Sequence, residues 1–294
     1  MRLREDNMLD RSATGAVAVA VAVAVALMVT VGGVQAFDDA KYPNWKGQWT
    51  RVMVPGVRGQ PGFDPTKPWG PGQQAPLTAE YQKVLEDSMA DQAKGGLGNY
   101  PTARCLPGGM PRMMTFGEHE YVITPETTYI LIGGADHFRR IFTDGRDWPT
   151  DVEPTYAGYS IGRWVDEDGD GRYDVLEIET RGFKGPRSYE ATGIPLHEDS
   201  ESVIRERIYI DRADADTLHD EITVIDHALT RPWTVDKRYK RDHNPIWFQN
   251  NCSEDNRHVF IGNEHYVISG DDFLMPAKKD QAPPDLRYFK QMRK

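Results

Sequence analysis

The chain has 294 residues, and its 45 acidic side chains outnumber its 35 lysines and arginines, which gives a net charge of −10 at neutral pH. An acidic chain without a basic run is a poor match for nucleic acid or an anionic membrane surface, so we exclude both partner classes. The 258 residues that follow the first 36 suit one large β domain or two small ones.

Residues 1–36 predict an export signal. A run of alanine and valine from Ala16 to Val31 follows three arginines and ends in Val34-Gln35-Ala36, the small-x-small pattern that signal peptidase cleaves. The run is shorter than the ~20 apolar residues that a comfortable membrane span needs. We therefore favour cleavage after Ala36 over an uncleaved anchor, and expect a periplasmic or secreted protein without membrane association beyond export.

Residues 37–100 predict a proline- and glycine-rich arm followed by one amphipathic helix. Apolar residues recur at helical spacing from Leu77 to Met89, with Thr78 as N-cap and Gly95-Gly96 as the end. A second short helix is expected at Asp285–Met292. Four aromatic residues of the arm are expected to pin it onto the body of the protein: Trp45, Trp49, Phe63 and Trp69.

The middle of the chain, residues 101–270, predicts a β domain, and residues 271–294 a tail. No long helix separates consecutive strands, which favours an antiparallel, lipocalin-like barrel, or a sandwich, over parallel βαβ units. Short alternating segments separated by turn residues predict these strands: Tyr121–Thr124, Thr128–Ile132, Phe138–Thr143, Ser160–Val165, Asp174–Thr180, Ser202–Ile210, Thr217–Asp226, Thr234–Tyr239, His258–Ile261 and Tyr266–Ile268.

The segment Asp166–Glu177 has the spacing of a twelve-residue calcium loop, with carboxylates at positions 1, 3, 5, 9 and 12 and Gly171 at position 6. Strands, not helices, flank it, so we expect a hairpin tip that a structural calcium ion rigidifies. The alternative is an acidic, hydrated turn without an ion. The expected ligands are Asp166, Asp168, Asp170, the Arg172 carbonyl, Asp174 and Glu177.

Alternation also places ionisable groups on three otherwise apolar strand faces. Glu206 shares a face with three isoleucines, Asp220 and Asp226 share one with Leu218, Ile222 and Val224, and Arg140 lies between Phe138 and Phe142. Unpaired buried charges are costly. These groups therefore form either a structural ion-pair network or a polar patch that orients a ligand or moves a proton.

The candidate catalytic residues follow from this second interpretation. His197 precedes a strand and adjoins two acidic residues, one of which could orient it as a general base. The motifs of serine hydrolases, zinc proteases, dithiol redox sites and nucleotide-binding loops do not occur in the sequence. The candidates for catalysis or ligand contact are Arg140, His197, Glu206 and Asp226.

The two cysteines, Cys105 and Cys252, are expected to form one disulfide after export. Two buried free thiols are the alternative.

Several motifs resemble a family of exported bacterial β-rich proteins. They are Cys105-Leu106-Pro107-Gly108-Gly109-Met110-Pro111-Arg112-Met113-Met114, Arg139-Arg140-Ile141 with Asp144-Gly145-Arg146, Ser160-Ile161-Gly162-Arg163-Trp164, Val175–Phe183 and Arg231-Pro232-Trp233-Thr234. The resemblance implies an exported β-rich fold without an assigned activity. The acidic loop is longer here than the family's short turn, so calcium is not implied for the family.

We expect the barrel interior to bind a small, partly apolar organic molecule, and isomerase, lyase or hydrolase chemistry would all fit its ionisable groups. The alternative is a non-catalytic, calcium-stabilised envelope protein that binds a protein or glycan.

Overall fold

The computed structural model describes residues 38–52, 75–99, 101–104, 106–115, 117–133, 137–190, 193–247 and 257–285. From Ala40 onward these residues belong to one compact unit. Several predictions lie outside the described residues, so they stay predictions: the leader and its cleavage site, the packing of Phe63 and Trp69, the Cys105–Cys252 disulfide and nearly all of the second helix.

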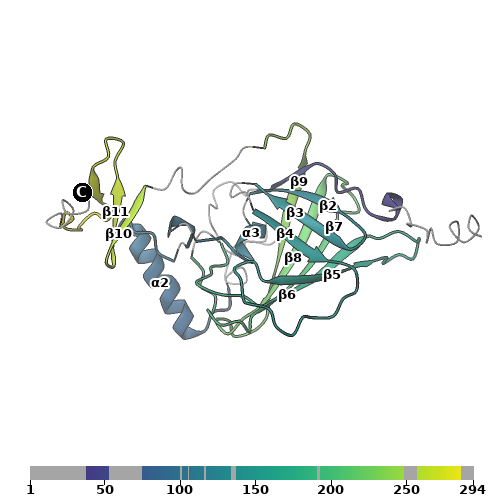
Figure 1. Cartoon of the computed structure of the whole chain (residues 1–294), viewed down its shortest axis with the longest axis horizontal. Helices are drawn as coiled ribbons and strands as arrows, with labels where there is room; N and C mark the ends of the chain where they lie inside the picture. The colour runs from purple at the N-terminus through teal and green to yellow at the C-terminus, as the bar shows by residue number, and fades with distance from the viewer. Residues whose placement is uncertain are drawn as a thin grey trace, which may run out of the picture. The chain divides into compact units, whose positions relative to one another are not determined.

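Nine described strands form a single sheet that closes on itself as a barrel, in the order of the sequence (Figure 1). The barrel closes because β1 pairs with both β2 and β9, antiparallel on each side. This confirms the predicted β-barrel and excludes the sandwich. The strands are β1 (Gln48–Arg51), β2 (Glu118–Ile123), β3 (Thr127–Ile132), β4 (His137–Phe142), β5 (Tyr159–Val165), β6 (Val175–Arg181), β7 (Val203–Ile210), β8 (Thr217–Ile225) and β9 (Trp233–Asp242).

One neighbouring pair, β4 and β5, is parallel, unlike the fully antiparallel meander that we predicted. Strands that alternate in direction around a closed ring must be even in number, so a ring of nine needs a parallel pair. The pair is short: only Ile141 with Ser160 and Phe142 with Ile161 are in register. The barrel therefore has a seam with few backbone hydrogen bonds between β4 and β5.

The predicted arm contributes a barrel strand that the sequence prediction missed, since β1 lies within it. Trp45 and Trp49 are fully buried in the core, as expected, and the Trp49 indole N–H donates to the Trp45 carbonyl oxygen at 3.0 Å. The boundary between arm and barrel at residue 100 is therefore not a structural boundary.

The predicted amphipathic helix is α2 (Ala79–Ala93), and the Thr78 hydroxyl caps it by accepting the Tyr81 N–H at 3.4 Å. Leu77 and Leu85 pack against the core, whereas Met89 is 59% exposed, so the predicted apolar face is only partly buried. The remaining helical segments are η1 (Asp39–Lys41), η3 (Pro101–Arg104) and α3 (Arg112–Thr115).

The last described strands form a separate three-stranded sheet, although two of them were predicted as part of the β domain. The barrel has no free edge once β1 has paired with β9, so later strands must pair with each other. The Lys278 ammonium lies 2.5 Å from the Asp91 carboxylate at the C-terminal part of α2. The strands of this sheet are β10 (His258–Ile261), β11 (Glu264–Ile268) and β12 (Leu274–Pro276).

Candidate functional site

The barrel interior holds a buried ion pair between Arg139 on β4 and Glu206 on β7. Two parallel hydrogen bonds join them, Nη1 to Oε1 at 2.7 Å and Nη2 to Oε2 at 2.5 Å. The hydroxyls of Ser160 on β5 and Thr180 on β6 also accept from the guanidinium, at 3.2 and 2.8 Å. This polar belt crosses four consecutive strands, including the weak β4–β5 seam, and it cancels both charges.

The belt corrects the predicted orientation of β4. Arg139 and Ile141 point inward, while Arg140 is exposed on the outside, where its guanidinium lies 5.5 Å from the Tyr129 ring centroid. Phe138, expected to be buried, is 58% exposed. An inward Arg139 forms a bidentate ion pair with Glu206. This pair favours the observed orientation of β4 over the one that would bury Phe138.

Asp220, on β8, is the most unusual group in the interior. Its side chain is fully buried, and neither carboxyl oxygen has a hydrogen-bond partner among the described residues. Burial, and then the negative charge of Glu206, raise the pKa of Asp220 well above its ordinary value. A buried carboxyl group without partners is costly when ionised, so the proton-bearing acid is the favoured form.

Two tyrosine hydroxyls share this environment. Those of Tyr121 on β2 and Tyr189, in the connection between β6 and β7, are buried and also lack a partner within the described ranges. Burial raises the pKa of both phenols well above the ordinary value, and the negative charge of Glu206, with that of Asp220 whenever it is ionised, adds to the effect. Asp220 and the two phenols therefore lie within electrostatic reach of one another, and each is favoured in its protonated form.

Aromatic rings surround these polar groups. The Trp45 ring centroid lies 5.0 Å from that of Tyr121 and 4.9 Å from that of Trp164. On another side, the Tyr189 and Trp233 centroids are 4.7 Å apart. The indole N–H groups of Trp45 and Trp164 are further buried donors without a partner in the described part of the chain. The interior thus combines packed aromatic rings with hydrogen-bonding groups that have no partner among the described residues.

A second buried charge pair lies in the interior, between Lys237 on β9 and Glu190 at 3.8 Å. Burial lowers the pKa of the lysine and raises that of the glutamate, so it opposes both charges. Burial also lowers the pKa of His119 to about 4, and its Nε2 lies 3.4 Å from the Met113 carbonyl oxygen. The Nε2–H tautomer of a neutral imidazole fits this contact.

The other predicted site residues lie apart from this interior cluster. Asp226 follows β8, and its carboxylate accepts from the backbone N–H groups of His197 at 2.9 Å and Ala228 at 2.8 Å and from the Ser202 hydroxyl at 2.6 Å. These bonds give it a structural role that holds two loops together. His197 is half-exposed beside Asp199. Of the four predicted catalytic residues, only Glu206 faces the barrel interior.

The acidic loop forms the tip of the β5–β6 hairpin, as predicted. Oxygens of Asp166, Asp168 and Asp174 lie within 4.8 Å of one another, so these three expected ligands converge. Glu177 does not join them, because it lies on β6 and accepts from the Arg163 guanidinium at 2.7 Å. Gly171 has φ of +89°, the left-handed conformation that the sharp turn needs.

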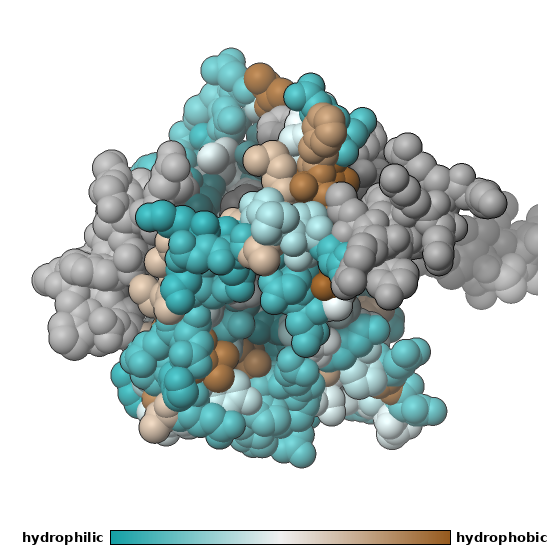
Figure 2. Space-filling model, turned by 90° about the vertical axis from the view of Figure 1, so that its left-hand side faces the viewer, coloured by the Kyte–Doolittle hydropathy of each residue, from teal (hydrophilic) through white to brown (hydrophobic). Residues whose placement is uncertain are grey.

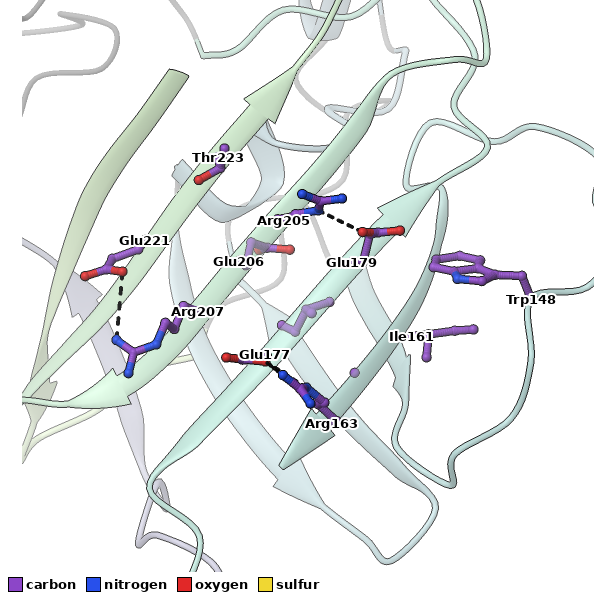
Figure 3. Close-up of a pocket in the computed structure, with 12 residues that line it drawn as sticks. Trp148, Ile161, Arg163, Glu177, Glu179, Arg205, Glu206, Arg207, Glu221 and Thr223 are labelled. Atoms are coloured by element: carbon purple, nitrogen blue, oxygen red, sulfur yellow. Dashed lines mark hydrogen bonds and ion pairs between the residues drawn. The ribbon is translucent and has the colours of Figure 1, made fainter. Parts of the chain in front are cut away.

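A groove on the outer face of β5–β8 is lined mainly by charged side chains that pair with one another, and Trp148 stands at one side (Figure 3). Arg205 donates to Glu179 at 2.8 Å, and Arg207 lies 4.0 Å from Glu221. Such exposed pairs leave little net charge to attract a partner and contribute little stability. The face in Figure 2 is largely hydrophilic too, with hydrophobic side chains only in small patches.

Comparison of the chain with models of known protein families and with curated proteins gives no match. The family resemblance therefore remains an expectation from the motifs. Among the described residues, none of the helices has both the length and the apolar character of a membrane span.

Proposed function

We propose that the barrel interior binds one small, partly apolar organic molecule that carries hydroxyl or carbonyl oxygens. The observation that carries the proposal is the group of buried, unpartnered polar atoms on Asp220, Tyr121 and Tyr189 within the described residues. Nearly all buried polar groups in folded proteins have a hydrogen-bond partner, so a group of exceptions supports the presence of an occupant. A ligand that bonds to these atoms removes the cost of their burial.

The polar and aromatic side chains of the barrel interior indicate which class of ligand would fit. The protonated Asp220 carboxyl, the two phenols and the indole N–H of Trp45 all donate hydrogen bonds, so they fit a molecule rich in acceptor oxygens. The aromatic rings that lie beside these donors, such as Trp45 next to Tyr121, favour a ligand that is partly apolar. Arg139 is already neutralised by Glu206, so a charged ligand group gains little there.

Proton transfer is the chemistry that this interior supports best. A carboxylic acid kept neutral by an apolar site can donate a hydrogen bond or proton to an oxygen that gains negative charge during reaction. Asp220 is suited to that role, and Tyr121 could share the developing charge. Isomerisation or elimination next to a carbonyl group would use both as donors to the oxygen, with Glu190, a buried carboxyl group of raised pKa, as the base that takes the proton from the adjacent carbon.

Native mass spectrometry of the exported protein tests the binding proposal. The wild type is expected to retain an added small-molecule mass that denaturation releases, and Asp220→Leu is expected to lose it. Arg140→Leu, on the outer face, is the matched control and should retain the mass. Equal retention by both variants would place the ligand outside the interior.

We also propose that Asp166, Asp168 and Asp174 hold a calcium ion that rigidifies the β5–β6 hairpin, with water completing the six to eight oxygens that calcium prefers. Calcium is expected to raise the melting temperature of wild type but not of Asp168→Asn. A wild type whose melting temperature is the same in calcium and in chelator contradicts this site.

Export is proposed from the leader sequence alone. The intact mass of the protein recovered from the periplasm or medium is expected to begin at Phe37. A mass that still includes Val34-Gln35-Ala36 would favour the uncleaved anchor.

A further inference from the structure

Two histidines and an aspartate converge at one end of the barrel, away from the interior cluster and the acidic loop. The Nδ1 atoms of His197 and His227 lie 2.8 and 2.9 Å from the same oxygen, Oδ2 of Asp199. His197 and Asp199 come from the connection between β6 and β7, and His227 follows β8. One nitrogen or oxygen atom from each residue lies within 4.8 Å of the other two.

The surrounding hydrogen bonds hold the three side chains in place. Asp226, the neighbour of His227, accepts the backbone N–H of His197 at 2.9 Å, which joins the two loops. Arg187 donates to the His197 carbonyl oxygen at 3.1 Å, and Asp199 accepts the Glu201 N–H through its other oxygen, Oδ1, at 3.1 Å. The cluster is therefore built on a braced framework, as metal sites require.

The Nδ1 atom of His197 has two competing contacts with Asp199. Nδ1 of His197 accepts the Asp199 backbone N–H at 3.1 Å, so it presents a lone pair there, yet it lies only 2.8 Å from the Asp199 carboxylate oxygen. Two acceptors at this distance repel one another. A cation that both atoms ligate, taking the Nδ1 lone pair in place of the backbone N–H, would turn this repulsion into attraction.

We propose that His197, Asp199 and His227 form a binding site for a divalent transition-metal ion, with zinc as the best match. Two imidazole nitrogens and one carboxylate oxygen are a frequent donor set for zinc, whereas calcium prefers oxygen alone. Zinc bonds of about 2.0–2.2 Å place ligand atoms about 3.3 Å apart, so the side chains need to separate by only a few tenths of an ångström. Water would take the fourth position of a bound zinc ion.

The ion has a route to this site, because the His227 side chain is 62% exposed and that of His197 is 37% exposed. The His227 Nε2 atom lies 3.7 Å from the Glu201 carboxylate, close to where the outer partner of a metal-bound histidine is commonly found. Binding would join the β6–β7 connection to the turn after β8 through the ion.

Zinc titration of the untagged full chain, with the bound metal counted by elemental analysis, tests the site. Wild type is expected to bind one zinc ion that His227→Asn binds at least about 100-fold more weakly, since one of three protein ligands is lost. His243→Asn is the matched control: His243 is similarly exposed and lies 3.0 Å from Asp216, but it belongs to no such cluster of described residues. This variant should bind zinc like wild type.

Cobalt provides a second readout that does not depend on affinity alone. Bound Co²⁺ is expected to give visible absorption bands of tetrahedral or five-coordinate geometry, which His227→Asn loses. Circular dichroism checks that this exposed substitution leaves the fold intact. A wild type that binds no zinc, or a His227→Asn variant that binds zinc as tightly as wild type, overturns the proposal and leaves Asp199–His227 as an ion pair.

Discussion

Arg139 and Glu206 form a two-point ion pair across the barrel from strands that are not neighbours, β4 and β7. Ser160 and Thr180, on the two intervening strands, complete the hydrogen bonds of the guanidinium. The side chains thereby connect β4 to β5 where the backbone supplies only a short parallel ladder. The pair therefore stabilises barrel closure, a role distinct from the ligand binding proposed for Asp220.

Arg139→Met is expected to lower the free energy of unfolding by about 3–5 kcal/mol, because it leaves the Glu206 charge buried without its partner. Urea denaturation measures the change. The double variant Arg139→Met/Glu206→Leu should recover much of the loss, since it buries no charge. A cost below about 1 kcal/mol for the single variant would mean that the pair is solvated.

Asp220→Asn is expected to change how stability depends on pH. The pKa of Asp220 is raised in the native state, so above the unfolded pKa of about 3.9 the native state binds more protons and wild-type stability falls as pH rises, by up to about 1.4 kcal/mol per pH unit. The side chain of the Asp220→Asn variant does not titrate, so this part of the pH dependence is expected to disappear. Unfolding curves at about pH 4.5 and about pH 6 measure the difference, and parallel pH profiles would contradict the raised pKa.

The protonation of His119 is expected to change stability with pH in the direction opposite to that of Asp220. Its pKa of about 4 lies below the unfolded value of about 6.5, so its contribution to stability is lost as pH falls through that interval. A proton NMR titration of the imidazole is expected to show a neutral ring from pH 8 down to about pH 5. Protonation near pH 6.5 would mean that the ring is hydrated.

Trp49→Ala is expected to destabilise the protein by about 3–5 kcal/mol, because it removes a fully buried indole from the short strand that closes the barrel. Trp148→Ala, at the outer groove, is the control and should cost much less. Denaturant unfolding of both variants measures the two losses in the free energy of unfolding. Similar costs would contradict the central position of β1 in the fold.

Much of the barrel could be predicted because period-two alternation is a local signal. Every predicted strand from Tyr121 to Ile268 has an observed counterpart, and Thr78 was identified as the helix cap. The strand β1 was missed because Gln48–Arg51 is only four residues long and lies beside a proline- and glycine-rich segment. Its strand conformation comes from pairing with β2 and β9, a tertiary effect that no local pattern contains.

The site was predicted less well than the fold, for a physical reason. Two adjacent arginines on one strand face opposite sides of the sheet, and the choice between Arg139 and Arg140 depends on the distant Glu206. Asp220 was recognised on an apolar face, but its lack of partners depends on the whole interior. Asp226 looked equivalent in sequence, yet three local donors satisfy its carboxylate.

A high-resolution crystal structure of the protein as purified is the decisive test of whether the barrel interior holds a ligand. We predict electron density for an organic molecule in the barrel interior, with an oxygen atom within hydrogen-bonding distance of Asp220 and of Tyr121 or Tyr189. An interior in which side chains or ordered water alone satisfy those three groups would contradict it.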